Sequence, residues 1–362
     1  MMKIFKTEQT KVLDAYTIQH EPITSFNLME RAVKALFEAI LPLLDRDKLV
    51  VIVAGPGNNG GDALVLAKLL TLIGQPLQVN LFHNGKISED CNMAKSQLKK
   101  QGTGVIENNW ALTIPNEAIV IDGLFGAGLS RPLANEYAEL VDKINLSGAE
   151  TWSIDIPSGL MGEQNEYEGA SIIKAARTFT FQQPKLSFFF SENSKYIGEL
   201  QTLDIGLHPQ AISDTDTNFF LVEPKDIKLN KRPPFSHKGT FGHALLIAGK
   251  YGMAGAAVLS SRSCMRMGVG LLTTHIPSQL YNIIQLSIPE AIVSLDENSQ
   301  NFSHVKDINR YSAIGIGPGL GVEEVSYEGF REILEANTAH IPMVIDADAL
   351  NIISKDKRML SL

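Results

Sequence analysis

Polar side chains that could bind a ligand or move a proton occur in three turn-forming stretches, of which the first is the richest in glycine. The first is Ala54–Asp62 (AGPGNNGGD), which holds Asn59 and Asp62, and the other two follow Asp122 and Asp155. Glycines let backbone amides approach a ligand closely, and a helix beginning behind them favours an anion such as phosphate. Carboxylates at such positions can exchange protons or face a cation. These stretches therefore indicate a site for a phosphorylated ligand with acid–base groups nearby.

The residue types and spacing of the first stretch do not match the common nucleotide-binding loops. The first stretch lacks the Gly-Lys-Ser/Thr of nucleoside triphosphate loops and the GxGxxG of ordinary dinucleotide folds. Asp62 would repel a phosphate, so we expect it to cap the following helix, accept a ribose hydroxyl or lie near a cation. The alternative is a plain turn and helix cap.

Short apolar runs precede the three stretches and predict the strands that position them. The runs are Leu49–Ala54, Ala118–Asp122, Thr151–Asp155 and Thr178–Phe181. Such runs are typical of parallel strands buried on both faces, with helices in the outer layers. Ligands bind beyond the carboxyl ends of these strands, so the three loops should meet in one pocket. Alternatively, Asp122 and Asp155 only cap the turns that follow them.

The sequence also predicts two helices in the first domain and a linker after it. We predict a helix over Ala63–Ile73, closed by Gly74, and another through Leu28 and Ile40 with Ser25 or Asn27 as its cap. Gly206–Pro234 is rich in proline, glycine and charge, which indicates a linker. The pattern then restarts, with strands predicted at these runs: His243–Ala248, Gly270–Ile276, Tyr311–Ile316 and Pro342–Asp346.

Composition indicates a globular protein without a polyanionic partner. Hydrophobic residues make up 44% and charged residues 20% of the 362 residues, and the net charge is −8. There is no basic patch for nucleic acid and no apolar run long enough for a membrane helix. The two cysteines, Cys91 and Cys264, form no metal-binding or disulfide pattern. We expect a cytoplasmic homo-oligomer that acts on a small molecule and binds neither nucleic acid nor membrane.

The chain from residue 1 to 215 resembles the YjeF N-terminal family, the NAD(P)HX epimerases. The resemblance rests on Leu28–Ala32 (LMERA), AGPGNNGGD, Asp122–Pro132 (DGLFGAGLSRP) and Ile154–Gly159 (IDIPSG). It implies a three-layer, Rossmann-like parallel sheet and a potassium ion held by Asn59, Asp122 and Ser158. It also implies a set of substrate-binding residues: Asn58, Asn59, Gly60, Gly61, Asp62, Gly126, Ala127, Gly128, Leu129, Ser130, Arg131, Pro132 and Asp155.

The reaction of that family interconverts the R and S hydrates of the nicotinamide ring at its carbon six. Inversion at this carbon calls for a proton donor and a proton acceptor close by. Asp155 is our first candidate, and Lys185, which follows Gln183 and Pro184, is the second. A solvated surface position is the alternative interpretation of Lys185.

The segment 225–362 resembles the ADP- or ATP-dependent NAD(P)HX dehydratases, which have a ribokinase-like α/β fold. The resemblance rests on Ser236–His243, Gly315–Gly321 and Ile345–Asn351. It implies that the substrate is also bound by Ala254, Gly317, Gly319, Gly321 and Asp346. The alternative is that these glycines form strand-to-helix turns and that Asp346 is a helix cap.

Later dehydratase motifs, a His-Pro-Gly-Glu segment and a Gly-Ser-Gly-Asp-like turn, do not follow Asn351 in this sequence. We therefore expect an incomplete second domain with one sheet face uncovered, whose ADP- or ATP-dependent activity needs a longer chain. The alternatives to an enzyme of this kind are a non-catalytic YjeF-type binding or scaffold module and, on the second segment alone, a sugar or vitamin kinase.

Overall fold

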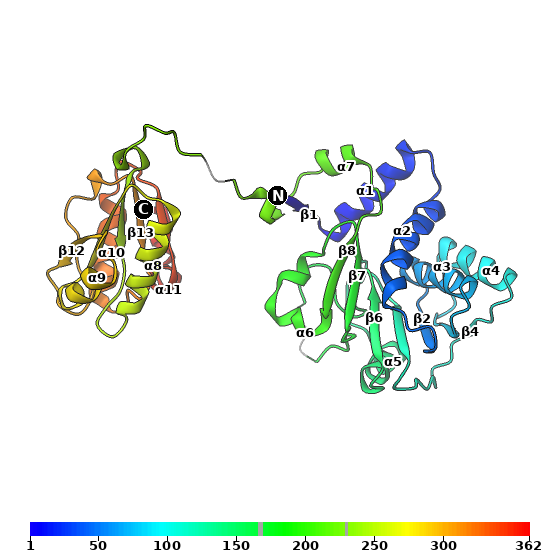
Figure 1. Cartoon of the computed structure of the whole chain (residues 1–362). Helices are drawn as coiled ribbons and strands as arrows, with labels where there is room; N and C mark the ends of the chain where they lie inside the picture. Colours follow the sequence, from blue (N-terminus) through cyan, green and yellow to red (C-terminus); the bar gives the residue numbers. More distant parts are fainter. Residues whose placement is uncertain (166–168, 229–230) are drawn as a thin grey trace. The chain divides into compact units, whose positions relative to one another are not determined.

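The chain folds into two compact units, which are described separately (Figure 1). The computed structural model describes residues 1–165, 169–228 and 231–362. The first unit is Met1–Lys228 and the second is Leu229–Leu362.

Within the described residues, the first unit is built on a seven-stranded parallel sheet with the order β4-β3-β2-β5-β6-β7-β8. The central strands β2 and β5 are buried along their whole length, as expected for apolar runs with helices on both sides. The strands are β2 (Val50–Ala54), β3 (Leu77–Leu81), β4 (Ile106–Glu107), β5 (Ile119–Gly123), β6 (Glu150–Ile154), β7 (Arg177–Phe181) and β8 (Glu199–Leu203).

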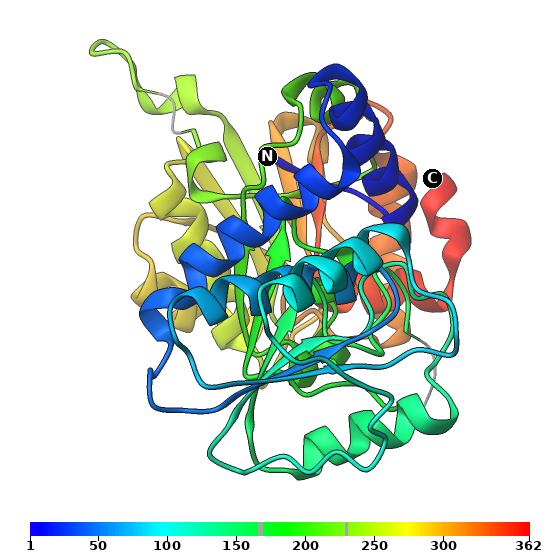
Figure 2. The same ribbon diagram turned by 90° about the vertical axis from the view of Figure 1, so that its right-hand side faces the viewer.

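Helices cover both faces of this sheet. On one face, α2 (Ser25–Ile40), α3 (Asn58–Leu72) and α4 (Glu89–Lys100) pack with alternate strand residues such as Ile52. On the other face, α5 (Asn135–Leu146) packs with their neighbours, such as Val53. Figure 2 shows the blue and cyan helices α2 to α4 on the side of the sheet away from α5. The predicted three-layer parallel fold is confirmed.

The interpretation of Gly206–Pro234 as a linker is wrong for its first part. Strand β9 (Phe219–Leu221) pairs antiparallel with β1 (Met2–Ile4), and α7 (Pro209–Asp214) packs near α1 (Thr7–His20). Lys3 Nζ also donates to the carbonyls of Ser213 and Thr215, at 2.7 and 2.8 Å. These contacts extend the first unit to Lys228, beyond residue 215, where the sequence placed its end. A short helix, α6 (Ser194–Ile197), precedes β8.

Both predicted helix starts in the first unit differ from the observed ones. Helix α3 begins at Asn58, so the second half of the glycine-rich stretch is its first turn and Asp62 is no cap. Helix α2 is capped by Thr24, whose Oγ1 accepts the Asn27 amide at 3.1 Å. Glycine at two helical positions and the polar pair Asn58-Asn59 concealed the true start of α3.

In its described residues, the second unit contains a parallel sheet with the order β12-β11-β10-β13-β14. Along β10, Leu245 and Ile247 face one core while Leu246 and Ala248 face the other. Helices α8 and α9 cover one face, and α10 and α11 cover the other. The elements are β10 (His243–Ile247), α8 (Ala254–Met267), β11 (Leu271–Pro277), α9 (Tyr281–Ser287), β12 (Ile292–Asp296), β13 (Ala313–Ile316), α10 (Glu324–Ala336), β14 (Met343–Ile345) and α11 (Ala347–Lys355).

The expectation of an uncovered sheet face in this unit is therefore wrong. The two helix pairs come from both halves of the segment, one pair following β10 and β11 and the other following β13 and β14. Strand–helix–strand connections are right-handed as a rule, so connections that run outward in both directions from β10 and β13 place a helix layer on each side of the parallel sheet. The α/β class expected for the second unit is confirmed.

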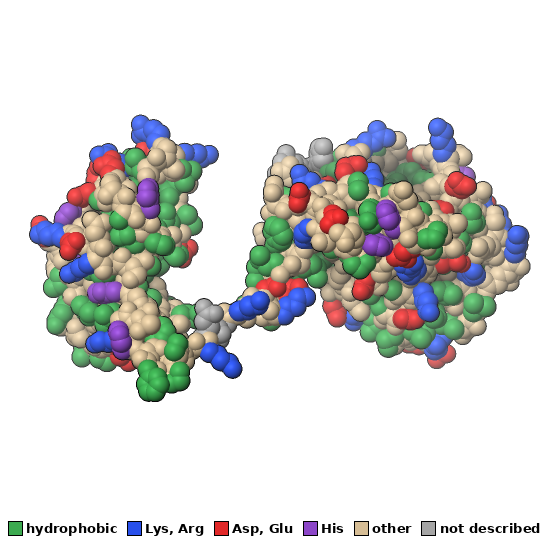
Figure 3. All heavy atoms as spheres, turned by 90° about the horizontal axis from the view of Figure 1, so that it is seen from above, with side chains coloured by type: hydrophobic (Ala, Val, Ile, Leu, Met, Phe, Trp, Pro, Cys, Tyr) green, Lys and Arg blue, Asp and Glu red, His purple; other side chains and the backbone are tan. Residues whose placement is uncertain are grey.

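The surface agrees with the charge balance of the sequence. On the face seen in Figure 3, lysine and arginine side chains alternate with aspartate and glutamate. In the described ranges, no helix has both the length and the apolar character needed to cross a membrane.

Candidate active site

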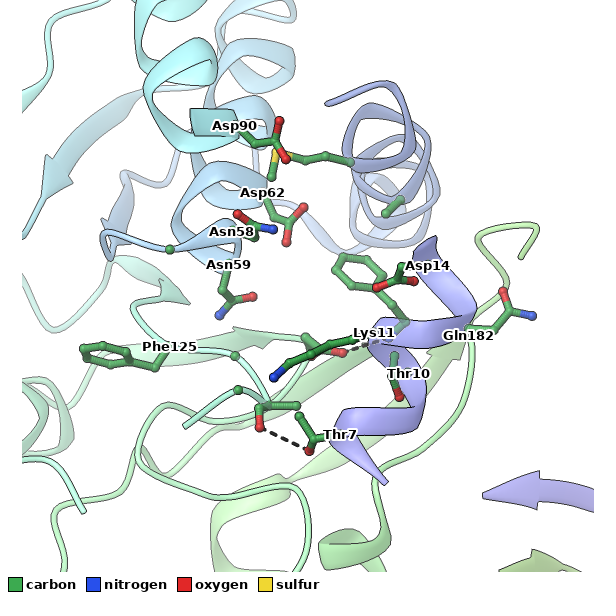
Figure 4. A pocket seen from close by; sticks show the side chains of 18 of the residues that line it. Thr7, Thr10, Lys11, Asp14, Asn58, Asn59, Asp62, Asp90, Phe125 and Gln182 are labelled. Atoms are coloured by element: carbon green, nitrogen blue, oxygen red, sulfur yellow. Dashed lines mark hydrogen bonds between the residues drawn. The ribbon is translucent and has the colours of Figure 1, made fainter. Parts of the chain in front are cut away.

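The carboxyl ends of β2, β5 and β6 open into a cavity of about 590 Å³ in the first unit. Figure 4 shows the loops after these strands on one side and helix α1 on another. Four carboxyl groups and three cationic groups line the cavity: Asp14, Asp62, Asp90, Asp155, Lys11, Arg131 and Lys185. The cavity thus brings acid–base groups and cations for an anionic ligand into one space.

Asp155 and Lys185 form an ion pair in this cavity. Lys185 Nζ lies 2.7 Å from Asp155 Oδ1, and the lysine is only 6% exposed. A solvated surface lysine, the alternative interpretation, therefore does not describe Lys185. Asp155 Oδ1 also accepts from Thr180 Oγ1 and from the Phe181 amide, both at 3.3 Å. Neighbouring strand ends thereby fix the carboxylate in place.

Asp155 has a left-handed backbone, with φ of +64°. Its amide donates to the Phe179 carbonyl at 2.7 Å and so continues the β6–β7 ladder one residue beyond the strand. Non-glycine residues with positive φ are uncommon, and they occur preferentially at functional sites. The chain turns sharply at this residue and points its carboxylate into the cavity.

Asp14 belongs to the same cavity, although no sequence pattern singled it out. It lies on α1 with Thr7, Thr10 and Lys11, and all four side chains line the cavity (Figure 4). Burial and the neighbouring Asp155 raise the pKa of Asp14 to about 6, against the opposing effect of Lys185. This carboxyl therefore changes its protonation state close to neutral pH.

Asp62 is a buried carboxyl in the second turn of α3. Burial raises its pKa well above the usual range, and the negative charges of Asp155, Asp14 and Asp90 add to the shift. The raised pKa favours the neutral carboxyl, which repels a phosphate less than a carboxylate does.

Close packing leaves no room for a side chain at two glycines of the β2–α3 turn. A Cβ on Gly60 would lie 1.8 Å from the Gly55 carbonyl oxygen, and one on Gly61 would lie 2.7 Å from the end of the Met29 side chain. Gly60 and Gly61 were expected to bind substrate, but neither lines the cavity. Their role in this structure is to let α3 pack against the turn and α2.

Asn59 lies at the base of the cavity with its side chain unpaired. Its Oδ1 and Nδ2 are buried and have no hydrogen-bond partner among the described residues. An unpaired buried amide is costly, so it points to a bound group at this position. The backbone of Gly126 lies against it, since a Cβ there would be 3.4 Å from Asn59 Cβ.

Asp122 and Ser158, which were expected in the same site, form a buried hydrogen-bonded pair, and neither of them lines the cavity. Ser158 Oγ donates to Asp122 Oδ1 at 2.5 Å and accepts the Phe125 amide at 2.9 Å. Asp122 also accepts from Ser153 Oγ and from the amides of Ser158 and Leu124. Burial raises the pKa of Asp122, while these hydrogen bonds oppose the shift.

The loop after β5 carries most of the remaining expected substrate contacts. Residues 126–131 line the cavity, and Thr7 Oγ1 of α1 donates to the Ala127 carbonyl at 3.2 Å. Arg131 is the cation that this loop contributes. Pro132, expected in the same site, lines a separate cavity with Gly159 and Tyr196.

In the second unit, the loops after β10, β13 and β14 meet. The Gly249 amide donates to the Pro318 carbonyl at 2.8 Å, and the Gly321 amide donates to Asp348 Oδ2 at 2.8 Å. A Cβ on Gly317 would lie 1.8 Å from the Asp346 carbonyl oxygen, and one on Gly319 would lie 2.7 Å from Ala256 Cβ. Ala254 is the first residue of α8, beside the same loops. The structure thus gathers Ala254, Gly317, Gly319, Gly321 and Asp346 at one sheet edge.

The comparisons with known proteins agree with this division into two units. Residues 25–187 match the family model described as YjeF-related protein N-terminus, and residues 244–361 match the model described as NAD(P)H-hydrate dehydratase. The chain is 30% identical over 370 residues to a bifunctional NAD(P)H-hydrate repair enzyme of Thermofilum pendens, covering 98% of this chain and 70% of that one. The chain belongs to the family of bifunctional NAD(P)H-hydrate repair enzymes.

The chain is also similar to two further proteins. A bifunctional repair enzyme of Coxiella burnetii is 29% identical over 360 residues, covering 98% of this chain and 72% of that one. The solved ADP/ATP-dependent NAD(P)H-hydrate dehydratase of Bacillus subtilis, crystallised with ATP and Mg²⁺, is 34% identical, with a TM-score of 0.29. That match covers 34% of this chain and 43% of the dehydratase, so the chain spans less than half of that enzyme's length.

Proposed function

We propose that the cavity of the first unit interconverts the R and S hydrates of NADH and NADPH. The observation that carries this proposal is the buried Asp155–Lys185 ion pair, which lies in a cavity lined by the glycine-rich turn. A scaffold module needs neither a buried ion pair nor an acid–base cluster open to a cavity, and burying such charges costs free energy.

The substrate's negative charge is met by local groups in this acidic protein. Arg131 on the loop after β5 and Lys11 on α1 are cations in the cavity, and α3 begins at its edge. A helix N-terminus and cationic side chains both favour phosphate. Together they would hold the pyrophosphate, so that the hydrated ring reaches the end of the cavity near Asp155.

Inversion at carbon six requires that the hydroxyl leave and that water return on the other face. Asp155 is placed to accept a proton from the incoming water, and the Lys185 ammonium group keeps its carboxylate oriented. A well-placed general base contributes about 10²–10⁴-fold to such a step. Asp155 is thus the proposed base and Lys185 its positioning partner.

A potassium ion fits the buried polar groups beside the cavity. Asn59 has an unpaired amide oxygen, and Ser158 and Asp122 have buried hydroxyl and carboxyl oxygens. Hard oxygen ligands of this kind suit an alkali cation. In the described part of the chain, no cluster of three or more His, Cys, Asp or Glu residues suits a transition metal. The ion would favour the ionised form of Asp122, against the effect of burial.

For the second unit we propose the dehydratase part of the repair, which uses ADP or ATP to return the S hydrate to NAD(P)H. Support comes from the meeting of Gly317–Gly321, Ala254 and Asp346 at the carboxyl edge of its sheet, where α/β folds bind ligands. The substrate contacts assigned to these residues are part of the proposal.

The test is to incubate the protein with purified R-NADHX, with and without ATP, and to separate the products by chromatography. We expect the S epimer to form without ATP, and NADH to form only when ATP or ADP is added. An unchanged epimer ratio without nucleotide would contradict the epimerase proposal. If the amount of NADH does not rise when ATP or ADP is added, only the assignment of the second unit is contradicted.

A further inference from the structure

Helix α1 brings one of the four carboxyl groups to the cavity from outside the segment that matches the epimerase family model. The match begins at residue 25, whereas α1 ends at His20. Thr7, Thr10, Lys11 and Asp14 nevertheless line the cavity, and they recur every three to four residues along one face of the helix. The buried Leu13 and Thr17 anchor α1 next to this face.

We infer that Asp14 is the proton donor of the epimerase, a catalytic residue that acts together with Asp155. The inference rests on the proposed function and adds the acid that this function needs. The two carboxyl groups come from different walls of the cavity, Asp14 from a helix and Asp155 from the turn after β6. They differ in their surroundings, since Asp155 is ion-paired with Lys185.

The surroundings of Asp14 suit a group that carries a proton. It faces Asp155 and Lys185 beyond the strand ends, Asp62 on α3 and Asp90 on α4, and Lys11 and Arg131 also line the cavity. Burial and Asp155 raise the pKa of Asp14 to about 6. Pairs of carboxyl groups whose environments separate their pKa values can divide the roles of acid and base.

The proposed step balances without any reactant other than water. Asp14 protonates the hydroxyl oxygen on carbon six, the C–O bond breaks with its electron pair going to oxygen, and water leaves. The ring nitrogen shares the resulting positive charge. Water then attacks carbon six from the other face, and its proton passes to Asp155. The reverse reaction moves the proton back from Asp155 to Asp14, and exchange with solvent resets both groups.

The first experiment measures the initial rate of conversion of R-NADHX to the S epimer, without nucleotide, between pH 5 and pH 9. We expect wild-type kcat/KM to fall above a pH of about 6, because Asp14 must be protonated to act. Asp14→Asn should lower kcat by about 10²–10⁴-fold, leave KM within a few-fold and remove this decline. Asp14→Glu should restore part of the rate and the decline at higher pH.

Asp47→Asn is the matched control, because Asp47 is an exposed carboxylate outside the cavity, and its rate should equal that of the wild type. Tryptophan fluorescence confirms folding, since both tryptophans, Trp110 and Trp152, lie in the first unit. A wild-type rate with an unchanged pH profile in Asp14→Asn would overturn the inference. If Asp155→Asn is then inactive, the proposed function still stands.

A second experiment follows oxygen exchange in water labelled with ¹⁸O. If the hydroxyl group leaves and water returns, each newly formed S epimer should carry one labelled oxygen at early times. A sample without enzyme measures the uncatalysed exchange, which is subtracted. An S epimer that keeps its original oxygen would overturn the proposed step, because the carbon–oxygen bond would then have stayed intact.

Discussion

Asp14 illustrates how a single residue can serve function at the expense of stability. Its pKa is raised to about 6, from an ordinary value near 3.8, so the folded protein binds this proton more tightly than the unfolded chain does. Below pH 4 the group is protonated in both states and costs nothing. As the pH rises from about 4 to about 6, the unfolded chain loses this proton while the folded protein keeps it, so stability falls and then stays level above pH 6.

We therefore predict that Asp14→Asn stabilises the first unit at pH 8 by up to about 3 kcal/mol, which is the equivalent of two pKa units. The gain should shrink as the pH falls and vanish near pH 4. Urea unfolding followed by tryptophan fluorescence at both pH values measures the difference. Equal stability of the two proteins at pH 8 would contradict the placement of Asp14 in a buried, acidic environment.

The second prediction concerns Asn59, because its buried side-chain amide has no hydrogen-bond partner among the described residues. Potassium should raise the melting temperature of the first unit more than lithium does at equal ionic strength, since a site in the folded state stabilises it by mass action. Asn59→Ala should remove this difference. It is a sharper probe than Asp122→Ala, because Asp122 accepts four hydrogen bonds that hold the fold together.

Identical melting of the wild-type protein in the two salts would contradict the cation site. Asp142→Ala is a suitable control, since Asp142 lies outside the cavity and accepts a hydrogen bond from Ser171. Its response to potassium should match that of the wild type.

At the scale of elements, the glycine-rich turn between β2 and α3 holds the site together through backbone packing. Gly60→Ala would force a methyl group to within 1.8 Å of the Gly55 carbonyl oxygen, so the turn and the helix must separate. We expect a loss of at least about 3 kcal/mol in the stability of the first unit, as for severe overpacking. Urea denaturation at pH 7 provides the measurement.

Gly57→Ala is the matched control in the same turn. A Cβ on Gly57 meets no atom within 4 Å, and the backbone there is extended. Because Gly57 is the N-cap of α3, alanine should cost at most about 1 kcal/mol. If the two substitutions lowered the stability of the first unit equally, close packing would not be the reason for glycine at position 60.

The same elements show what the sequence could predict and what it could not. Buried parallel strands such as Val50–Ala54 have continuous apolar runs, so their position and the meeting of Asp122 and Asp155 at one edge could be foreseen. Helix α1 could not be connected with the site, because Asp14 and Lys11 look like solvated positions on a helix. Whether these side chains point into the cavity depends on how α1 is placed, and α1 follows β1, which pairs with β9 more than 200 residues away.

At the scale of the whole molecule, the first unit depends on a segment that resembles a linker. Strand β9 pairs with β1, and Gln9 Nε2 donates to the Asp216 carbonyl at 2.6 Å. Thr217 Oγ1 also donates to the Ile4 carbonyl at 2.6 Å. These contacts hold the start of α1 and hence the position of Asp14.

We predict that a chain ending at Lys228 retains full epimerase activity, because the assigned epimerase residues and their supports all lie before that point. A chain ending at Thr215 should melt several degrees lower and be less active, since β1 loses its partner strand. Tryptophan fluorescence melting and the R-to-S assay compare the two. Equal melting temperatures would contradict the role assigned to β9.

The most direct test of the central claim compares wild-type protein and Asp155→Asn in converting R-NADHX to the S epimer at saturating substrate. Asparagine tolerates the left-handed backbone of this position and keeps the shape of the side chain, so the fold should be preserved. We predict epimerase activity in the wild type and a rate about 10²–10⁴-fold lower in the variant. A variant that works at the wild-type rate would contradict the assignment of this cavity as the epimerase active site.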